Sequence, residues 1–130
     1  MFEIIIDVQN YFGNKEIFTF SDEGKSGLII HEKGNFKDTD ELDRKTISKA
    51  DFENIIKAFS EVNFTKVFNE HSDLIGLDGW ILICTIKKGT VNISAQLWCP
   101  VKDPSMPETT KLLEACELVC PIFELDGMES

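Results

Sequence analysis

Four cysteines and two histidines are the side chains of this sequence best suited to metal binding or nucleophilic chemistry. Cys84, Cys99, Cys116 and Cys120 contain no C-x-x-C pair, the spacing typical of zinc ribbons and thioredoxin-like redox motifs. Cys116 and Cys120 lie one helical turn apart on the apolar face of an expected helix, where free thiols pack as small hydrophobic groups. We therefore expect buried, reduced thiols and no metal site.

The two histidines do not complete a catalytic motif. A Cys–His pair assembles in space, so its distance along the chain excludes nothing. However, His31 lies in an expected strand and His71 in an acidic loop, and neither is near a nucleophile elbow or an oxyanion-hole motif. Phosphate-binding glycine loops and dinucleotide fingerprints are also missing from the sequence. We predict a protein that is not an enzyme and needs no cofactor.

The segment DTDELD, Asp38 to Asp43, suggests calcium binding at first sight. With Asp38 at the first position of a calcium loop, Asp43 would occupy the sixth position, which requires glycine. Lys49 would occupy the twelfth position in place of the bidentate glutamate. The calcium pattern therefore fails, and the segment is interpreted as a cluster of surface charge.

The charge balance excludes some partners and favours others. Thirteen basic and 23 acidic residues give a net charge of −10, which disfavours nucleic acid and anionic membrane surfaces. Residues 103–130 alone hold seven acids, including Glu114 and Glu117, and one base. Such acidity serves solubility, or it steers a basic protein partner to the surface.

The hydrophobic pattern predicts strands in the first half of the chain. Apolar residues alternate with polar ones over 2–9, and a turn at Gly13-Asn14 leads to a second strand. A three-residue loop at 12–14 would pair Val8 with Phe18 and keep the apolar residues on one face. A third strand is expected over 28–32. Residues 41–47 form either a fourth strand, which we favour, or part of a long loop.

Two amphipathic helices are expected. The first covers 49–62 and begins with a capping box of Ser48 and Asp51. The second begins with a similar box of Ser105 and Glu108 and ends at Pro121. Residues 64–68 fit a short turn or a second helical piece.

The segment from Trp80 to Trp98 predicts a hairpin with two different faces. With Lys88-Gly89 as a two-residue turn, one face is fully apolar and suits a core. The other face carries Ile81, Ile83 and Trp98 among uncharged polar groups. A loop or tail of this chain covers that second face, or another protein binds it.

These elements predict the α+β class: a single antiparallel sheet of five to six strands with two helices on one face, in the order βββ(β)αββα. We expect one domain over 1–123 and a flexible acidic tail over 124–130. The chain starts MFEIIID, with neither a basic leader nor a long apolar run, so we expect a cytoplasmic protein.

The segment GLDGW…LWCP…PETTKLLEACE, from Gly76 to Glu117, resembles segments of small acidic bacterial immunity proteins of toxin–immunity systems. Such systems include polymorphic toxins and contact-dependent inhibition. The resemblance implies a non-enzymatic protein that binds and occludes a toxin domain, often a basic nuclease.

We therefore predict a basic toxin as the partner, and a chain that is a monomer or a weak dimer. Six acids are expected to steer the partner: Asp38, Asp40, Glu41, Asp43, Glu114 and Glu117. Ile81, Ile83 and Trp98 are expected to anchor it. The alternatives are a structural or interaction protein, or a carrier of small ligands with a pocket between sheet and helices lined by phenylalanines.

Overall fold

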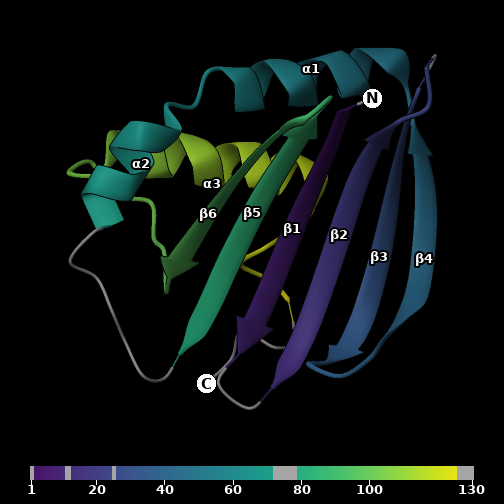
Figure 1. Ribbon diagram of the computed structural model, residues 1–130, viewed down its shortest axis with the longest axis horizontal. Coiled ribbons are helices and arrows are strands. Elements are labelled where there is room, and N and C mark those ends of the chain that lie inside the picture. Colours follow the sequence, from purple (N-terminus) through teal and green to yellow (C-terminus); the bar gives the residue numbers. More distant parts are fainter. Residues whose placement is uncertain (1, 11–12, 25, 72–78, 126–130) are drawn as a thin grey trace.

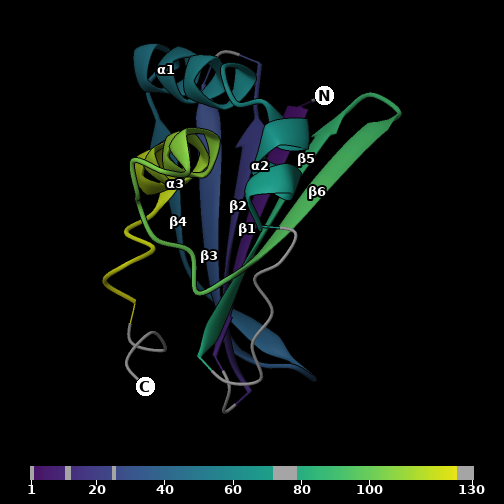
Figure 2. The same cartoon turned by 90° about the vertical axis from the view of Figure 1, so that its left-hand side faces the viewer.

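A computed structural model describes residues 2–10, 13–24, 26–71 and 79–125 of the chain. These residues form one antiparallel sheet with the strand order β4-β3-β2-β1-β5-β6, and the helices lie on one face of that sheet (Figures 1 and 2). The strands are β1 (Phe2–Asn10), β2 (Asn14–Asp22), β3 (Gly27–Asn35), β4 (Thr39–Ile47), β5 (Trp80–Lys88) and β6 (Val91–Trp98). The helices are α1 (Lys49–Ser60), α2 (Phe64–His71) and α3 (Pro107–Val119). The class and the single sheet agree with the prediction.

The number of helices was predicted wrongly, because the described residues contain three and not two. The additional helix, α2, coincides with the apolar residues expected to form a short turn or helical piece. It begins where the side-chain oxygen of Asn63 accepts a hydrogen bond from the Lys66 N–H at 3.1 Å. Val67 is fully buried, and this contact with the core stabilises a helix too short to be stable alone.

The core lies between the sheet and the helices. Seven helix-facing residues in the middle of the central strands are buried: Ile4, Ile6, Val8, Phe18, Phe20, Leu82 and Cys84. Ile55 and Phe59 of α1 and Leu112 and Leu113 of α3 cover them. Period-two alternation in the strands and a 3.6-residue period in the helices place these residues on facing surfaces.

In the first hairpin the predicted faces are confirmed, but the predicted register is wrong by two residues. Ile6 pairs with Phe18 and Ile4 with Phe20. The side chain of Asn10 accepts a hydrogen bond from the Asn14 N–H at 3.0 Å, so the strands close at these two residues. Gly13 has a φ of +88°, which favours glycine, and sits just before the second strand.

In the second hairpin the predicted faces are also confirmed, and the predicted register is again wrong by two residues. Leu82 pairs with Leu97 and Lys88 with Val91, so the turn is Gly89-Thr90, one residue later than predicted. Gly89, with a φ of +62°, is the first central residue of the turn, as in type II′ turns. The shift by two residues in pairing leaves every side chain on its predicted face.

One predicted helix cap is confirmed and one is wrong. The Ser48 hydroxyl accepts a hydrogen bond from the Asp51 N–H at 3.2 Å and caps α1. Ser105 does not cap α3, because its hydroxyl donates to Asp103 at 2.8 Å. The first N–H groups of α3 instead donate to the carboxylate of Glu70 in α2.

Three of the four cysteines and the last described residue, Leu125, are buried. Cys84, Cys116 and Cys120 are buried, Cys99 is half-buried, and all four are free. Leu125 belongs to the core, and the rest of the expected acidic tail, 126–130, lies outside the described residues. No described helix is long and apolar enough to cross a membrane.

Candidate functional site

The first candidate surface is the sheet face opposite the helices, called here the outer face. In Figure 1 the sheet lies in front of α3, and in the described part of the chain no helix covers the outer face (Figure 2). An aliphatic stripe crosses its centre. The stripe consists of Ile5, Ile17, Ile30, Ile81 and Ile83, all half-buried among their neighbours.

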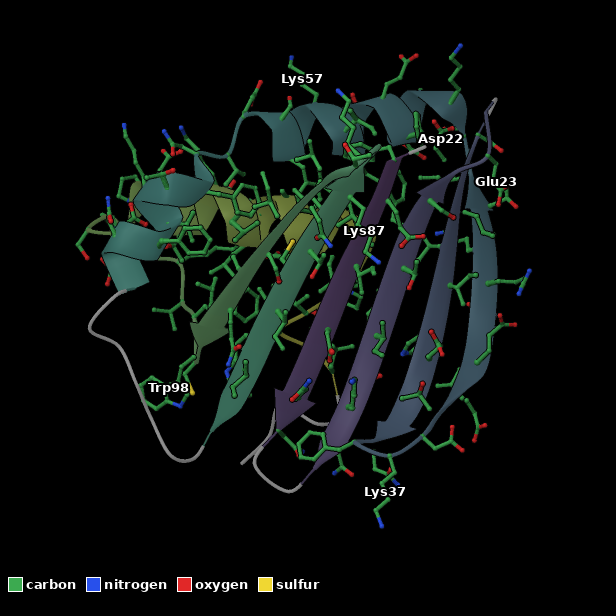
Figure 3. All side chains as sticks on the ribbon, viewed as in Figure 1. Asp22, Glu23, Lys37, Lys57, Lys87 and Trp98 are labelled. Carbon is green, nitrogen blue, oxygen red and sulfur yellow. The ribbon has the colours of Figure 1, made fainter. Side chains whose placement is uncertain are left out.

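The structure brings the three predicted anchor residues together on the outer face. Ile81 pairs with Trp98 across β5 and β6, and Ile83 lies two residues further along β5. Figure 3 shows Trp98 at the end of β6, at the border of the sheet. The apolar stripe and the tryptophan therefore form one surface.

Asp7 lies at the centre of the outer face, between Ile17 and Ile83 in the pairing of the strands. Its Oδ2 accepts a hydrogen bond from Gln9 at 3.2 Å and forms an ion pair with Lys15 at 3.3 Å. Its Oδ1 is buried without a hydrogen-bond partner in the described part of the chain. A buried carboxylate oxygen without a partner costs free energy unless another group approaches it.

Acids neutralise the basic side chains of the outer face. Lys15 pairs with Asp7, Lys87 with Glu3 at 4.0 Å, and Arg44 with Glu41 at 2.6 Å. The hydrogen bond and charge of Arg44 hold the pKa of the Glu41 carboxyl below its usual value. No excess of positive charge therefore opposes a basic partner on this face.

The predicted acidic cluster lies at the β4 edge and is divided between the two faces of the sheet. Asp38 is in the turn before β4, where the Asn35 side chain accepts hydrogen bonds from the N–H groups of Lys37 and Asp38. Asp40 and Glu41 are exposed on β4. Glu41 pairs with Glu32 and is in the same row of the outer face as Ile83. Asp40 and Asp43 instead lie on the helix side, because they pair with Lys33 and His31 of the core-facing row of β3.

The two predicted acids of α3 do not join this cluster. Glu114 and Glu117 are exposed on the helix side of the molecule, and Glu117 forms an ion pair with Lys102 at 2.5 Å. Of the six predicted steering residues, Glu41 therefore lies on the outer face and Asp38 in the turn at the same edge, while the other four are on the helix side.

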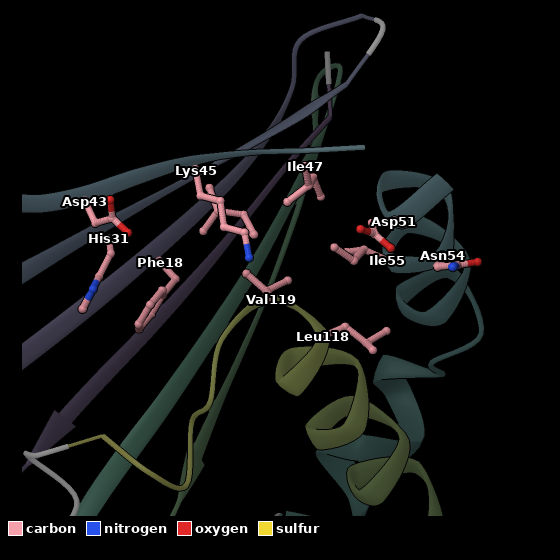
Figure 4. A pocket seen from close by; sticks show the side chains of 11 residues that line it. Phe18, His31, Asp43, Lys45, Ile47, Asp51, Asn54, Ile55, Leu118 and Val119 are labelled. Atoms are coloured by element: carbon pink, nitrogen blue, oxygen red, sulfur yellow. The ribbon is translucent and has the colours of Figure 1, made fainter. Parts of the chain in front are cut away.

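The second candidate surface is a groove on the helix side, with a volume of about 400 Å³ (Figure 4). It lies where β2, β3 and β4 meet α1 and α3. Its wall is apolar at Phe18, Ile29, Ile47, Ile55 and Val119. Its polar side chains are His31, Asp43, Lys45, Asp51 and Asn54.

A part-buried hydrogen bond between Glu16 and His31 at this groove was not found from the sequence. Nε2 of His31 lies 2.9 Å from Oε1 of Glu16, and the His31 ring stacks on Phe18 with 4.2 Å between centroids. Glu16 is only 7% exposed. The signal was present in the alternation of β2, because Glu16 shares the parity of Phe18 and therefore faces the core. His31 was interpreted only as a surface or edge residue.

The groove combines an apolar wall with ionisable side chains. Among the described residues that line it there is no serine, threonine or cysteine. The described part of the chain also contains no group of three histidine, cysteine or acidic side chains arranged to hold a metal ion. His31 and Lys45 offer hydrogen-bond donors beside an apolar wall.

No known family model matches the sequence, and no curated protein matches it. Its function is therefore inferred from the outer face and the groove.

Proposed function

We propose that this protein is a non-enzymatic binding protein of the immunity type, which neutralises a basic bacterial toxin domain by occluding it with the outer face. The observation that carries the proposal is the aliphatic stripe beside Trp98, which no described helix covers. Apolar and aromatic side chains are the usual anchors of protein interfaces, and the central charge of this face, Asp7, is paired with Lys15. Trp98 and Ile83 are the anchors.

The charge of the molecule supports a basic partner. The chain carries a net charge of −10, the cations of the outer face are paired, and the turn before β4 adds Asp38 at its edge. Complementary charge accelerates the encounter of two proteins, while the apolar centre holds the complex once formed. Acids at the edge and isoleucines at the centre fit this division of roles.

Half-buried Asp7 supports the same choice of partner. Its Oδ1 has no hydrogen-bond donor from the described residues. A lysine or arginine of a basic partner would supply that donor in a desolvated environment, where a charge-assisted hydrogen bond is strongest.

The test is co-expression with the toxin encoded beside the gene of this protein. The unmodified chain should restore growth, and Ile83→Asp should abolish rescue, because it places a charge in the apolar centre. Lys57→Ala changes an exposed residue of α1 on the other side of the sheet (Figure 3) and serves as the matched control. Rescue by Ile83→Asp as strong as by the control would contradict the outer face as the binding surface, and growth arrest with the unmodified chain would contradict the function.

The groove supports a second candidate, the binding of a small amphipathic ligand. Its volume of about 400 Å³ falls within the range of small-molecule sites, and its apolar wall borders the donors of His31 and Lys45. Native mass spectrometry of the purified chain should then show a co-purified ligand. Ile29→Trp would fill the groove and remove that ligand, and an unliganded mass for the unmodified chain would reject this candidate.

A further inference from the structure

Strand β6 forms an edge of the sheet that is suited to pairing. Within the described part of the chain, β6 pairs only with β5. Its eight residues, VNISAQLW, include no charged residue and no proline. A long uncharged edge strand presents a row of backbone groups to which another strand can bind.

The opposite edge, β4, has the features that prevent such pairing. Five of its nine residues are charged, namely Asp40, Glu41, Asp43, Arg44 and Lys45. A bulge also interrupts its register, because Leu42 has no partner between the pairs His31–Asp43 and Glu32–Glu41. Charges and bulges are the usual protection of an edge strand, and β6 has neither.

The hairpin geometry determines which backbone groups of β6 point away from the sheet. Val91 closes the two-residue turn opposite Lys88, and the Cys99 N–H donates to the Trp80 carbonyl at 2.8 Å. Odd-numbered residues therefore bond to β5, because hydrogen-bonded positions alternate along an antiparallel pair. The N–H and C=O groups of Asn92, Ser94 and Gln96 point outward.

Apolar side chains on the helix side of β6 are also exposed. Val91 is 58% exposed and Ile93 is 39% exposed, although both share the face of buried Ala95 and Leu97. They belong to the half of β6 near the hairpin turn, which extends away from the helices (Figure 2). The helix layer of this chain therefore leaves part of the core face of β6 open.

We propose that β6 pairs with β6 of a second copy of this chain, antiparallel and about a two-fold axis at Ser94. In this register Ser94 lies opposite Ser94 of the other copy, and Asn92 lies opposite Gln96. On the helix side, Ile93 lies opposite Ala95 and Val91 opposite Leu97, so each exposed aliphatic residue meets an apolar one. Paired strands lie about 4.8 Å apart, close enough for these contacts.

The sequence of β6 favours a second copy as the occupant. Two chains with a net charge of −10 repel each other overall, but β6 carries no charge, so pairing along this strand brings no like charges of the two strands together. The strand is also self-complementary on the outer face. In this register the hydroxyl of Ser94 lies opposite that of the second Ser94, and the amide of Asn92 lies opposite that of Gln96. Pairing of identical patches is the rule for two-fold dimers. This dimer does not depend on the proposed toxin partner.

Sedimentation equilibrium of the purified full chain tests the proposal. The mass should rise with concentration from 14.7 kDa towards twice that value. One strand pair gives a weak dimer, so the series should extend to about 1 mM protein. Ser94→Lys places two like charges across the axis and should keep the chain monomeric over the whole series.

Two further variants test whether the dimer forms through pairing at position 94. Thr85→Ala removes the hydrogen bond that Ser94 makes at 3.1 Å without adding charge, and this matched control should dimerise like the unmodified protein. Ser94→Asp alone should be monomeric, but an equimolar mixture of Ser94→Asp and Ser94→Lys should restore the dimer, because only a two-fold pairing at position 94 brings these side chains together.

Hydrogen exchange of the unmodified protein supplies a test that needs no variant. The amides of Asn92, Ser94 and Gln96 should exchange more slowly at high than at low protein concentration. A mass of 14.7 kDa at every concentration would overturn the proposal. So would a dimer that Ser94→Lys leaves unchanged, or exchange at these three amides that is independent of concentration.

Discussion

Glu70 of α2 caps α3, since its carboxylate accepts hydrogen bonds from the N–H and the hydroxyl of Thr109 at 2.8 and 2.6 Å. The contact is reciprocated, because the carboxylate of Glu108 accepts the N–H of Asn63 directly before α2 at 3.0 Å. Each helix thus supplies a negative charge to the start of the other, where free N–H groups and the helix dipole favour it.

Removing the Glu70 carboxylate should loosen both helices. Glu70→Ala leaves the first N–H groups of α3 without their acceptor, and we expect a loss of about 1 kcal/mol in the free energy of unfolding. Urea denaturation followed by circular dichroism measures it. Glu53→Ala removes an exposed acid of α1 and is the control. Equal stability of the two variants would show that the cap contributes nothing.

Stability should fall with acidification through the same cap. Burial acts to raise the pKa of Glu70, but hydrogen bonds from Thr109 and the Glu108 N–H outweigh it and hold this pKa below its usual value. A lowered folded-state pKa stabilises the protein above the pKa of the unfolded chain, and this contribution is lost as pH falls through the folded-state value. Urea midpoints should therefore decrease from about pH 5 to about pH 3, and less so in Glu70→Gln. Parallel pH profiles for the two proteins would contradict the assignment.

The hydrogen bond between Glu16 and His31 should stabilise the protein. His31→Leu leaves the buried Glu16 carboxylate without this partner, and we expect a loss of about 1 to 2 kcal/mol in the free energy of unfolding. The double variant with Glu16→Leu should recover most of it, because two apolar side chains replace the pair. A double-mutant cycle by urea denaturation measures this coupling, and additive losses would show that the two residues act independently.

The four cysteines should differ in their reactivity towards a thiol reagent. Burial raises the pKa of the Cys120 thiol, and a hydrogen bond to Cys84 together with burial raises that of Cys116. With the thiolate as the reactive form, a thiol reagent at pH 8 should modify the half-buried Cys99 and spare the other three until urea is added. Peptide mapping by mass spectrometry checks the site, and rapid modification of Cys116 in the folded chain would contradict this burial.

Salt should slow binding of the toxin partner if acids steer it. Raising the ionic strength screens exposed charges beyond about 10 Å, so the association rate should decrease steeply while dissociation changes little. Asp38→Asn with Glu41→Gln should reduce that salt dependence, and Glu114→Gln on the helix side is the control. Stopped-flow kinetics measure the association rate, and an association rate independent of salt would contradict steering by these acids.

The faces of the strands could be predicted from the sequence, but their exact pairing could not. Ile6 faces the core in either register, because a shift by two residues preserves the face, and alternation alone does not distinguish Val8 opposite Phe18 from Val8 opposite Glu16. In the second hairpin, the choice depended on whether Gly89 is the first or the second turn residue. The position of Gly89 in the turn depends on the backbone twist of the hairpin, which cannot be predicted from the hydrophobic pattern.

Contacts between distant elements were also beyond the sequence. The Ser105–Glu108 pattern has the spacing of a capping box, yet Glu108 binds α2 and Ser105 binds Asp103. Only the packing of α2 against α3 decides this. The grouping of Ile81, Ile83 and Trp98 followed from period-two alternation, whereas the division of the acids between two faces depended on how β4 and α3 sit in the fold.

The charged and bulged β4 edge limits how far the proposed strand pairing can extend. Because one described strand edge per molecule is suited to pairing, joining two molecules through β6 would consume every such edge and leave only β4 at both ends of the extended sheet. Growth by strand pairing would then terminate at two subunits, and the sheet would not propagate into a fibre.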